Sequence, residues 1–251
     1  MTMLFLRPNE LDTTTMIKVD AVNTLTVSYA LDRDKNTRWT TVGYGTSTAT
    51  IFSIEFETST VIDKFYLQNH NLKQFRVFYN SVTANTLTPN ISETTNSATS
   101  NYYSFATVTV NSLQLQCDLA TTVDTEKKVG EIYAGSLMLA FERNPNAASY
   151  KPLVDRQSVV HRMPNGGSTQ FIVANKFKGD ISWKYLTESF YNSLLNIYET
   201  ATAIHFVPFP TTTSWDGKAY ECIWTNDFDF KHSDSNKDAG FGGIIKLEEV
   251  A

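Results

Sequence analysis

Lys176-Phe-Lys-Gly-Asp-Ile-Ser-Trp183 opens the part of the sequence that decides the fold, and this part runs on to Val250. A single helix is predicted within it, over residues 188–199. Thr187 is the expected N-cap, because a threonine hydroxyl can accept a hydrogen bond from an N–H group of the first turn. The expected buried face of the helix is one apolar stripe at helical spacing, formed by Phe190, Leu194, Ile197 and Tyr198.

Short β-rich runs surround this helix and predict the sheet on which it lies. They span residues 203–207, 219–225, 227–231 and 242–248. Before the helix, two β-rich arms flank Asn165-Gly-Gly-Ser168, and an Asn-Gly turn in that position predicts a long hairpin over about 158–175. We expect Asn165, Gly166 and Gly167 to form its turn and the hairpin to serve assembly.

The first half of the chain has the pattern of a β-sandwich. Phe52, Ile54 and Phe56 alternate with polar residues, and strict alternation predicts a half-buried strand. Further strands are expected over 3–6, 25–29, 61–67, 75–79, 102–110, 112–117 and 129–134, with an exposed loop over 80–101. The chain is therefore predicted to be mostly β, with a jelly-roll sandwich over 1–141 and a β-rich domain with one helix over 142–251.

Charge and composition exclude several functions. The 21 Lys and Arg residues and 26 Asp and Glu residues give a net charge of −5, spread along the chain without a basic half, so nucleic-acid binding is not expected. No apolar run approaches the roughly 20 residues that span a bilayer, and Met1–Pro8 lacks the basic leader of a signal peptide. A surface rich in Thr, Ser and Asn without an export signal suggests a virion component released by lysis.

Catalytic chemistry is not indicated. The four histidines do not fall at metal-ligand spacing, and no nucleophile elbow, phosphate-binding loop or dinucleotide fingerprint occurs. Asp227 and Asp229 share a strand face in the prediction, but such a pair is usually a solvated surface. Cys117 and Cys222 are interpreted as two reduced thiols, with a disulfide left open. We expect no enzyme and no cofactor.

Residues 15–140 resemble discoidin-type (coagulation-factor C-type) domains. The resemblance lies in an Asp-rich turn before Asn36-Thr-Arg-Trp39, followed by Val61-Ile-Asp-Lys64, Phe75-Arg-Val-Phe-Tyr79 and Val129-Gly-Glu-Ile-Tyr133. It implies a galactose-binding-like jelly-roll sandwich. The sequence departs from the family at Arg33, where a glycine usually follows the first Asp of the turn.

Two sites follow from this resemblance. Some relatives hold a structural calcium ion at the Asp-rich turn, and Asp32, Asp34 and Asn36 supply suitable oxygen donors here, although Arg33 and Lys35 lie among them. Relatives that bind glycans use loops at one end of the sandwich.

The candidate glycan contacts in this sequence are Trp39, Tyr44, Asn69 and His70, with Asn71 beside them. Each has a structural alternative. Trp39 is also suited to anchor the core, Tyr44 to be an ordinary exposed aromatic residue, and His70 to be an ordinary turn histidine.

Residues 150–250 resemble modules of bacteriophage tail-tube, tail-tip and distal-tail proteins. The resemblance lies in the strand–helix–strand order, the turn Trp215-Asp-Gly217 and the run Phe228-Asp-Phe230. It implies a virion structural protein of a phage tail (tail tip, baseplate or distal tail), which forms a ring homo-oligomer and contacts other phage tail proteins. The sandwich would decorate the outside of the ring, where it could contact host-surface glycans. The alternative function is a carbohydrate-binding module attached to a larger assembly.

Overall fold

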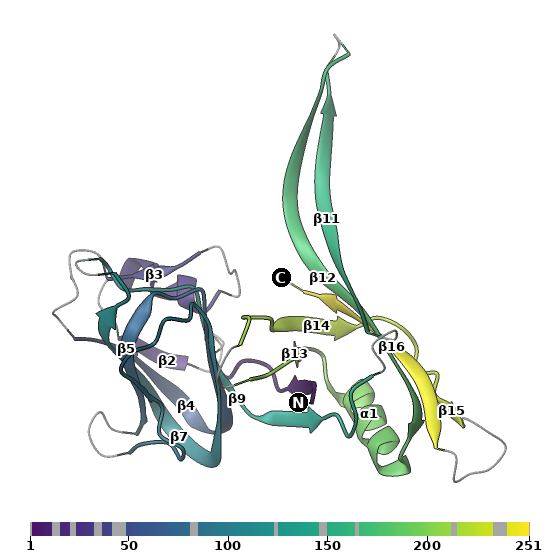
Figure 1. Cartoon of the computed structure of the whole chain (residues 1–251), viewed down its shortest axis with the longest axis horizontal. Coiled ribbons are helices and arrows are strands. Elements are labelled where there is room, and N and C mark those ends of the chain that lie inside the picture. The colour runs from purple at the N-terminus through teal and green to yellow at the C-terminus, as the bar shows by residue number, and fades with distance from the viewer. Residues whose placement is uncertain are drawn as a thin grey trace. The chain divides into compact units, whose positions relative to one another are not determined.

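A computed structural model describes most of the chain: residues 2–11, 16–20, 24–32, 37–41, 49–80, 85–122, 125–145, 150–163, 166–211, 215–232 and 240–250. The protein is mostly β with one α-helix, which confirms the predicted fold class. The chain divides into two compact units (Figure 1). Unit 1 contains Leu6–Met138 and Val207–Lys218, and unit 2 contains Thr2–Phe5, Leu139–Phe206 and Ala219–Ala251. The change from unit 1 to unit 2 after Met138 thus lies close to the predicted boundary at 141. The assignment of Thr2–Phe5 to unit 2 and of Val207–Lys218 to unit 1 was not expected.

Unit 1 is an antiparallel β-sandwich. Its main sheet has six strands, in the order β2-β4-β7-β5-β6 with β9 also pairing β4, and β3 pairs β8 separately. The elements are β2 (Met16–Asp20), the 3-10 helix η1 (Thr24–Ala30), β3 (Trp39–Thr40), β4 (Thr50–Gln68), β5 (Leu72–Tyr79), β6 (Ser92–Glu93), β7 (Asn101–Ala120), β8 (Lys128–Val129) and β9 (Glu131–Gly135).

The two longest strands of unit 1 each join two strands that the sequence predicted separately. β4 covers all but the first residue of the predicted run 49–57 together with 61–67, and β7 covers both 102–110 and 112–117. Their shared register shifts between Glu55 and Thr60, and a strand that bends at such an irregularity can pass from one layer of a sandwich to the other. The first part of β4 pairs with β2 and its last part with β9, so the bend lets one strand serve two sets of neighbours.

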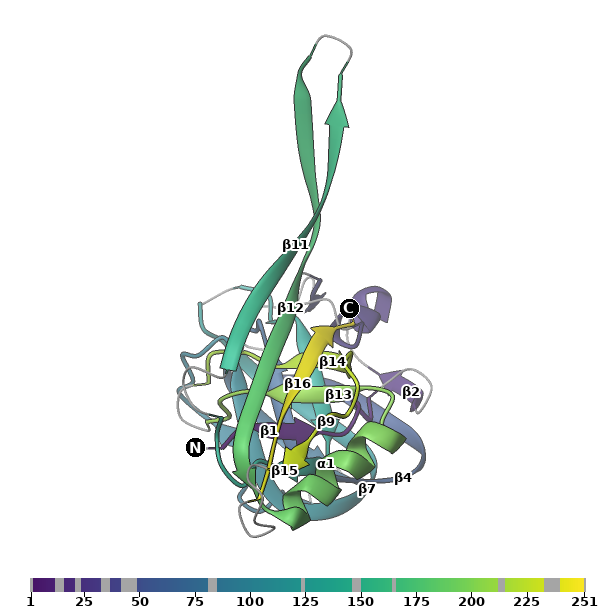
Figure 2. The same cartoon turned by 90° about the vertical axis from the view of Figure 1, so that its right-hand side faces the viewer.

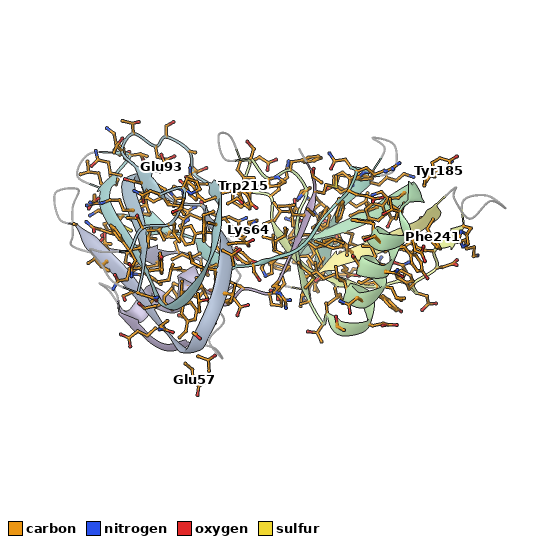
Figure 3. The ribbon with its side chains drawn as sticks, turned by 90° about the horizontal axis from the view of Figure 1, so that it is seen from below. Glu57, Lys64, Glu93, Tyr185, Trp215 and Phe241 are labelled. Atoms are coloured by element: carbon orange, nitrogen blue, oxygen red, sulfur yellow. The ribbon has the colours of Figure 1, made fainter. Side chains whose placement is uncertain are left out.

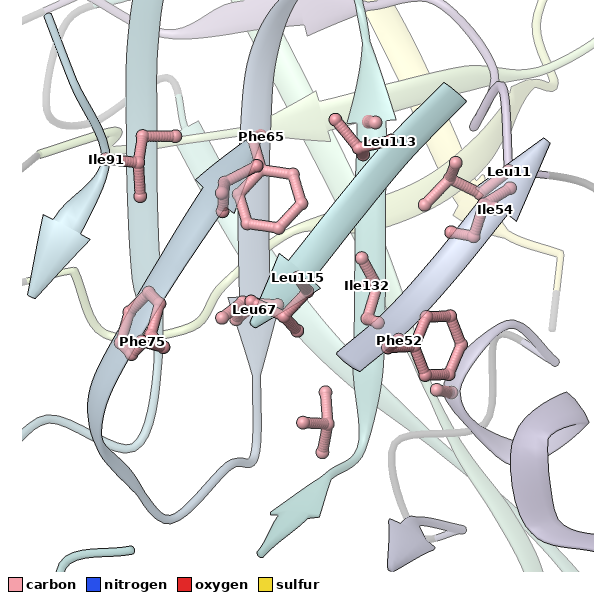
Figure 4. Packing of buried hydrophobic residues seen from close by; sticks show 14 of the residues in the cluster. Leu11, Phe52, Ile54, Phe65, Leu67, Phe75, Ile91, Leu113, Leu115 and Ile132 are labelled. Carbon is pink, nitrogen blue, oxygen red and sulfur yellow. The ribbon is translucent and has the colours of Figure 1, made fainter. Parts of the chain in front are cut away.

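The core of unit 1 follows from the alternation in β4. Phe52, Ile54 and Phe56 are buried as predicted, and Glu55 and Glu57 between and after them are exposed. Figure 4 shows how residues from several strands meet in this core. Complete burial of an apolar side chain of this size contributes about 1.5–3 kcal/mol, so the cluster is the main stabilising element of the sandwich.

Unit 2 is built on an eight-stranded sheet in the order β10-β1-β13-β14-β16-β12-β11, with β15 also pairing β16. Its elements are β1 (Leu4–Leu6), β10 (Leu137–Ala140), β11 (Tyr150–Arg162), β12 (Ser168–Leu186), α1 (Glu188–Thr200), β13 (Ile204–Val207), β14 (Tyr220–Trp224), β15 (Lys231–His232) and β16 (Phe241–Glu249).

Helix α1 lies on this sheet with the predicted cap and nearly the predicted face. The N–H of Phe190 donates to the hydroxyl of Thr187, and Phe190, Leu194 and Ile197 are buried. The ring of Phe190 contacts those of Phe141 and Trp183, with centroids 6.0 and 6.3 Å away. Tyr198 is 38% exposed, so it lies at the edge of the buried stripe rather than within it.

Two predicted strands are wrong. Residues 25–29 belong to η1, where Val27 and Ala30 face the core at the three-residue spacing of a 3-10 helix. Within 227–231, only Lys231 joins a strand. The side chain of Asn226 explains this. It donates to the Ile244 carbonyl at 3.0 Å and accepts from the Lys246 N–H at 2.6 Å. These backbone groups of β16 are therefore not available to pair with a strand over 227–231.

The predicted loop over 80–101 is also more ordered than expected. Leu87 and Ile91 are buried, and β6 pairs with β5. Two apolar side chains therefore hold this Thr- and Asn-rich segment against the sandwich.

Candidate functional site

The hairpin of β11 and β12 is longer than predicted and extends beyond the rest of its own sheet (Figures 1 and 2). β11 pairs with β12 from Tyr150 opposite Ile181 to Arg162 opposite Ser168. β16 pairs with β12 only from Lys178 onward. We call residues 156–162 and 168–176 the distal arm. Gly166 lies in the turn between these two segments and has a φ of 83°, while Asn165 lies outside the described residues.

Apolar side chains of the distal arm are exposed. Val160, Phe171 and Ile172 have 53%, 55% and 53% of their surface exposed, respectively. Val159 lies opposite Phe171, while Ile172 lies opposite Ser158, one position further along. Since neighbouring residues of a strand point to opposite faces, both faces of the ribbon carry exposed apolar groups.

Both edges of the distal arm are open. In the part of the chain that the structure describes, β11 pairs only with β12, and residues 168–177 of β12 pair only with β11. Each edge therefore presents backbone N–H and C=O groups outward. An isolated two-stranded hairpin is marginally stable in water, and open edges of this kind favour pairing with another chain.

The base of the hairpin is firmly attached, in contrast to the distal arm. The ammonium group of Lys178 forms ion pairs with Asp155 at 3.1 Å and Glu248 at 3.2 Å, and hydrogen bonds to these carboxylates raise its pKa. The ring of Phe177 stacks on that of Tyr220 with centroids 4.0 Å apart. The arm is thus a projecting ribbon on a fixed base.

Trp39 is the core anchor of the sandwich. Its side chain is fully buried, and its ring meets that of Phe52 edge to face with centroids 5.3 Å apart. A ring without exposed surface cannot stack on a sugar, so the expected glycan contact by Trp39 is corrected to a packing role. Tyr44 lies outside the described residues.

His70 and its neighbours hold a turn together. His70 is buried, its Nε2 lies 2.8 Å from Asn101 Oδ1, and its Nδ1 accepts the N–H of Leu72 at 3.1 Å. Burial lowers the pKa of His70 to about 4, against the opposing effect of its hydrogen bond with Asn101. Asn69 has a positive φ of 53°, and the side chain of Asn71 donates to the Glu126 carbonyl at 2.8 Å. His70 thus has a structural role, and the buried ring of Trp39 offers no surface on which a sugar could stack.

The predicted calcium site is described only in part. The hydroxyl of Thr37 lies 2.8 and 3.0 Å from the two carboxylate oxygens of Asp32. Asp34 and Asn36 lie outside the described residues. Within the described ranges, no group of three or more His, Cys, Asp or Glu side chains could hold a metal ion. Calcium at this turn stays a prediction.

The two cysteines of the chain are Cys117 and Cys222. Cys117 and Cys222 do not form a disulfide, and both are buried. Burial raises the pKa of the Cys117 thiol to about 12, so this thiol is protonated at neutral pH. Among the residues that the structure describes, no helix is long and apolar enough to cross a bilayer.

Sequence reasoning missed the role of Trp215. Its ring lies against Tyr66 and Tyr102 with centroid distances of 5.1 and 5.9 Å, so it belongs to unit 1 (Figure 3). The signal available was a tryptophan in a polar turn after the Pro-rich run Val207-Pro-Phe-Pro210. Nothing in that pattern indicates which part of the chain the tryptophan contacts.

Comparison with known proteins gives similarities of architecture alone. No protein-family model matches the chain, and no curated protein matches it in sequence. Chitosan-binding module 1 of a chitosanase/glucanase from Paenibacillus sp. IK-5 is similar with a TM-score of 0.41 and 13% identity, covering 51% of this chain and 98% of that one. A carbohydrate-binding module from Clostridium perfringens, in complex with GalNAc-beta-1,3-galactose, has a TM-score of 0.40 and 14% identity, covering 50% and 98%. A pectin-binding module has a TM-score of 0.37 and 17% identity, covering 47% and 89%.

Proposed function

We propose that this protein is a structural subunit that assembles with copies of itself through the distal arm of unit 2. The observation that carries the proposal is the arm itself, a two-stranded ribbon with exposed apolar residues on both faces and two open edges. Complete burial of one such Val, Ile or Phe side chain contributes about 1.5–3 kcal/mol. Edge groups gain backbone partners from a neighbouring subunit at the same time.

A phage tail is the assembly that we propose, at the tail tip, the baseplate or the distal tail. The support is the resemblance of residues 150–250 to tail modules, together with a hairpin that precedes a helix-covered sheet. In this proposal unit 2 forms a ring, contacts other tail proteins and places the protein in the virion. Unit 1 decorates the ring, and the chain has no catalytic activity.

The solution mass of the full chain tests this function. We expect light scattering to give a multiple of 28.3 kDa, and negative-stain electron microscopy to show closed rings. The paired substitutions Val159→Asn and Phe171→Asn should return the mass to that of the monomer. Ile223→Asn is the matched control, because Ile223 is an exposed apolar residue of unit 2 outside the arm. A wild-type monomer at all concentrations would contradict self-assembly.

Carbohydrate binding by unit 1 is the second candidate. It is supported by the discoidin-type resemblance of residues 15–140 together with the sandwich architecture that this resemblance implies. Trp39 takes no part, since its ring is buried. We expect binding on a glycan array that is lost in Tyr44→Ala and kept in Tyr29→Ala, because Tyr29 is an exposed tyrosine of unit 1 that is not among the expected contacts. Equal binding by both variants would remove Tyr44 from the site.

A further inference from the structure

The distal arm is cationic as well as apolar. Residues 156–176 contain Arg156, Arg162 and Lys176 and no Asp or Glu. Taking these three from the 21 basic residues of the chain leaves 18 against 26 acidic ones, a net charge of −8 outside this stretch. Arg162 and Val160 share one face of the ribbon with Ile172, which lies opposite Ser158. That face therefore offers both a positive charge and apolar surface.

A surface with the complementary properties lies on α1 and residues 225–230, which we call the acidic aromatic face. α1 contains Glu188 and Glu199 and no basic residue, and residues 225–230 add Asp227 and Asp229, of which Asp229 forms an exposed ion pair with Lys231 at 3.3 Å. The ring of Phe228 joins the two segments by contacting Tyr191 and Tyr198, with centroids 5.3 and 5.6 Å away. The face is thus negatively charged and includes the partly exposed ring of Tyr198.

The far end of the arm lies away from the acidic aromatic face of its own copy. The arm contains the start of β12 at Ser168, whereas α1 begins two residues after β12 ends at Leu186. A strand rises about 3.3 Å per residue, so β12 places α1 roughly 60 Å from the far end of the arm at Ser168 and roughly 30 Å from its near end at Lys176. Figure 2 shows this separation within unit 2, with the arm and α1 at opposite ends of β12.

A lipid surface fits the distal arm less well than a protein surface. Its apolar residues lie on both faces of the ribbon, whereas a membrane would cover one face or the tip. Both edges also present backbone groups that hydrocarbon cannot satisfy. A second copy supplies apolar surface and negative charge together.

We propose that the distal arm of one copy docks on the acidic aromatic face of a second copy. This inference rests on the self-assembly proposed above and names the surface that receives the arm. Because arm and face are different surfaces, the contact is head-to-tail, and each copy both gives an arm and receives one. Repetition of such a contact closes into a ring where the rotation between copies permits it.

Charge reversal tests the pairing with two variants of the full chain. The arm variant carries Arg156→Glu and Arg162→Glu, and the face variant carries Glu199→Arg, Asp227→Arg and Asp229→Arg, which leaves Glu188 as the one carboxylate of the face. Each places like charges on its own arm and face, so each alone should remain at the monomer mass of 28.3 kDa in light scattering. Mixed in equal amounts, each contact between an arm variant and a face variant joins opposite charges, so the mixture should assemble again, and it should regain the wild-type mass in a ring with an even number of copies.

Matched controls separate this effect from unfolding and from a general change of charge. The separate variants Lys73→Glu and Glu57→Arg each reverse one exposed charge of unit 1, so they shift the net charge in opposite directions, and both should leave the mass unchanged. Circular dichroism melts of all variants show whether each is folded. Higher salt should weaken wild-type assembly, because exposed charges are screened beyond about 8–10 Å at physiological ionic strength.

Each remaining outcome overturns the inference in a distinguishable way. If the arm variant is monomeric but the face variant assembles normally, or if the folded mixture stays monomeric, the receiving surface is wrong while arm-mediated assembly stands. If the wild type is monomeric at all concentrations, the proposed function fails together with the inference. Co-sedimentation of a monomeric wild type with phosphatidylglycerol vesicles, lost in the arm variant, would assign the arm to an anionic lipid surface instead.

Discussion

The side-chain amide of Gln68 donates a 2.7 Å hydrogen bond to the carbonyl oxygen of Gly217, 149 residues further along the chain. Both residues belong to unit 1, because Val207–Lys218 returns to the sandwich after α1 and β13 have been completed in unit 2. The same segment brings Trp215 against Tyr66. The sandwich is therefore not one continuous stretch of sequence, and its stability should depend on residues near position 215.

Removing the Trp215 side chain should destabilise unit 1 strongly. Trp215 is buried, and replacing a buried tryptophan with alanine costs about 3–5 kcal/mol. Urea unfolding followed by circular dichroism measures the loss. Phe209→Ala is the control in the same segment and should cost far less, because that side chain is 44% exposed. Equal losses for the two variants would show that the segment is not part of the core.

Trp215→Phe should cost much less than Trp215→Ala. In the described part of the chain the indole Nε1 of Trp215 is buried and has no hydrogen-bond partner. A buried polar group without a partner costs about 1–3 kcal/mol, so phenylalanine removes that penalty while it keeps most of the ring contacts. The same urea titration decides the matter, and a loss as large as that of the alanine variant would contradict it.

Gly217→Ala should destabilise unit 1 for two separate reasons. Gly217 has a φ of 74°, and a Cβ there would lie 2.7 Å from Ser100 Oγ. A side chain in the left-handed region costs about 1–2 kcal/mol by itself. Gly166→Ala isolates this term, since Gly166 has a φ of 83° and open space around it. Calorimetric melts should show the larger loss for Gly217→Ala, and equal losses would mean that Ser100 moves aside without cost.

The stability of unit 1 should fall on acidification because of His70. The pKa of His70 is about 4 in the folded protein and 6.5 in its ordinary state, so between these pH values the unfolded chain binds more protons. The contribution is complete above pH 6.5 and is lost as the pH falls toward 4. At 1.36 kcal/mol per pKa unit, its full size is about 3 kcal/mol. The physical cause is burial of the ring, and its Nδ1 is already occupied as acceptor for the Leu72 N–H.

Chemical unfolding at several pH values measures this dependence. His70→Asn offers a similarly placed acceptor that does not titrate, and its stability should change less between pH 7 and pH 4 than that of the wild type. Parallel pH profiles for the two proteins would show that His70 is not the titrating group.

Thr187→Ala should weaken α1 by about 0.5–2 kcal/mol, the range for loss of an N-cap. The Thr187 hydroxyl accepts the N–H of Phe190 at 3.2 Å and donates to Glu142 Oε2 at 2.6 Å. Thr200→Ala is the control, because the Thr200 hydroxyl donates to the Asn196 carbonyl in the last turn and accepts no N–H of the first turn. Thermal melts that rank the two variants equally would contradict a capping role.

The sequence by itself determined the features that depend on near neighbours. Thr187 and the apolar spacing after it predicted α1, the alternation around Phe52 predicted the inward face of β4, and Asn165-Gly predicted the hairpin. In each case the information lies within a few residues, because helical and strand periodicities and turn preferences act locally. The class of fold followed from these elements.

Only the tertiary structure decided which distant residues meet. It placed Trp215 in unit 1, buried Trp39 and His70 instead of offering them to a ligand, and joined four predicted strands into β4 and β7. It also showed that the far end of the arm and α1 lie at opposite ends of β12. Such contacts depend on the free energy of the whole packed chain, and a tryptophan buries equally well against any partner of suitable shape. For that reason the sequence predicted the elements, and their packing selected which of the candidate residues remain available for function.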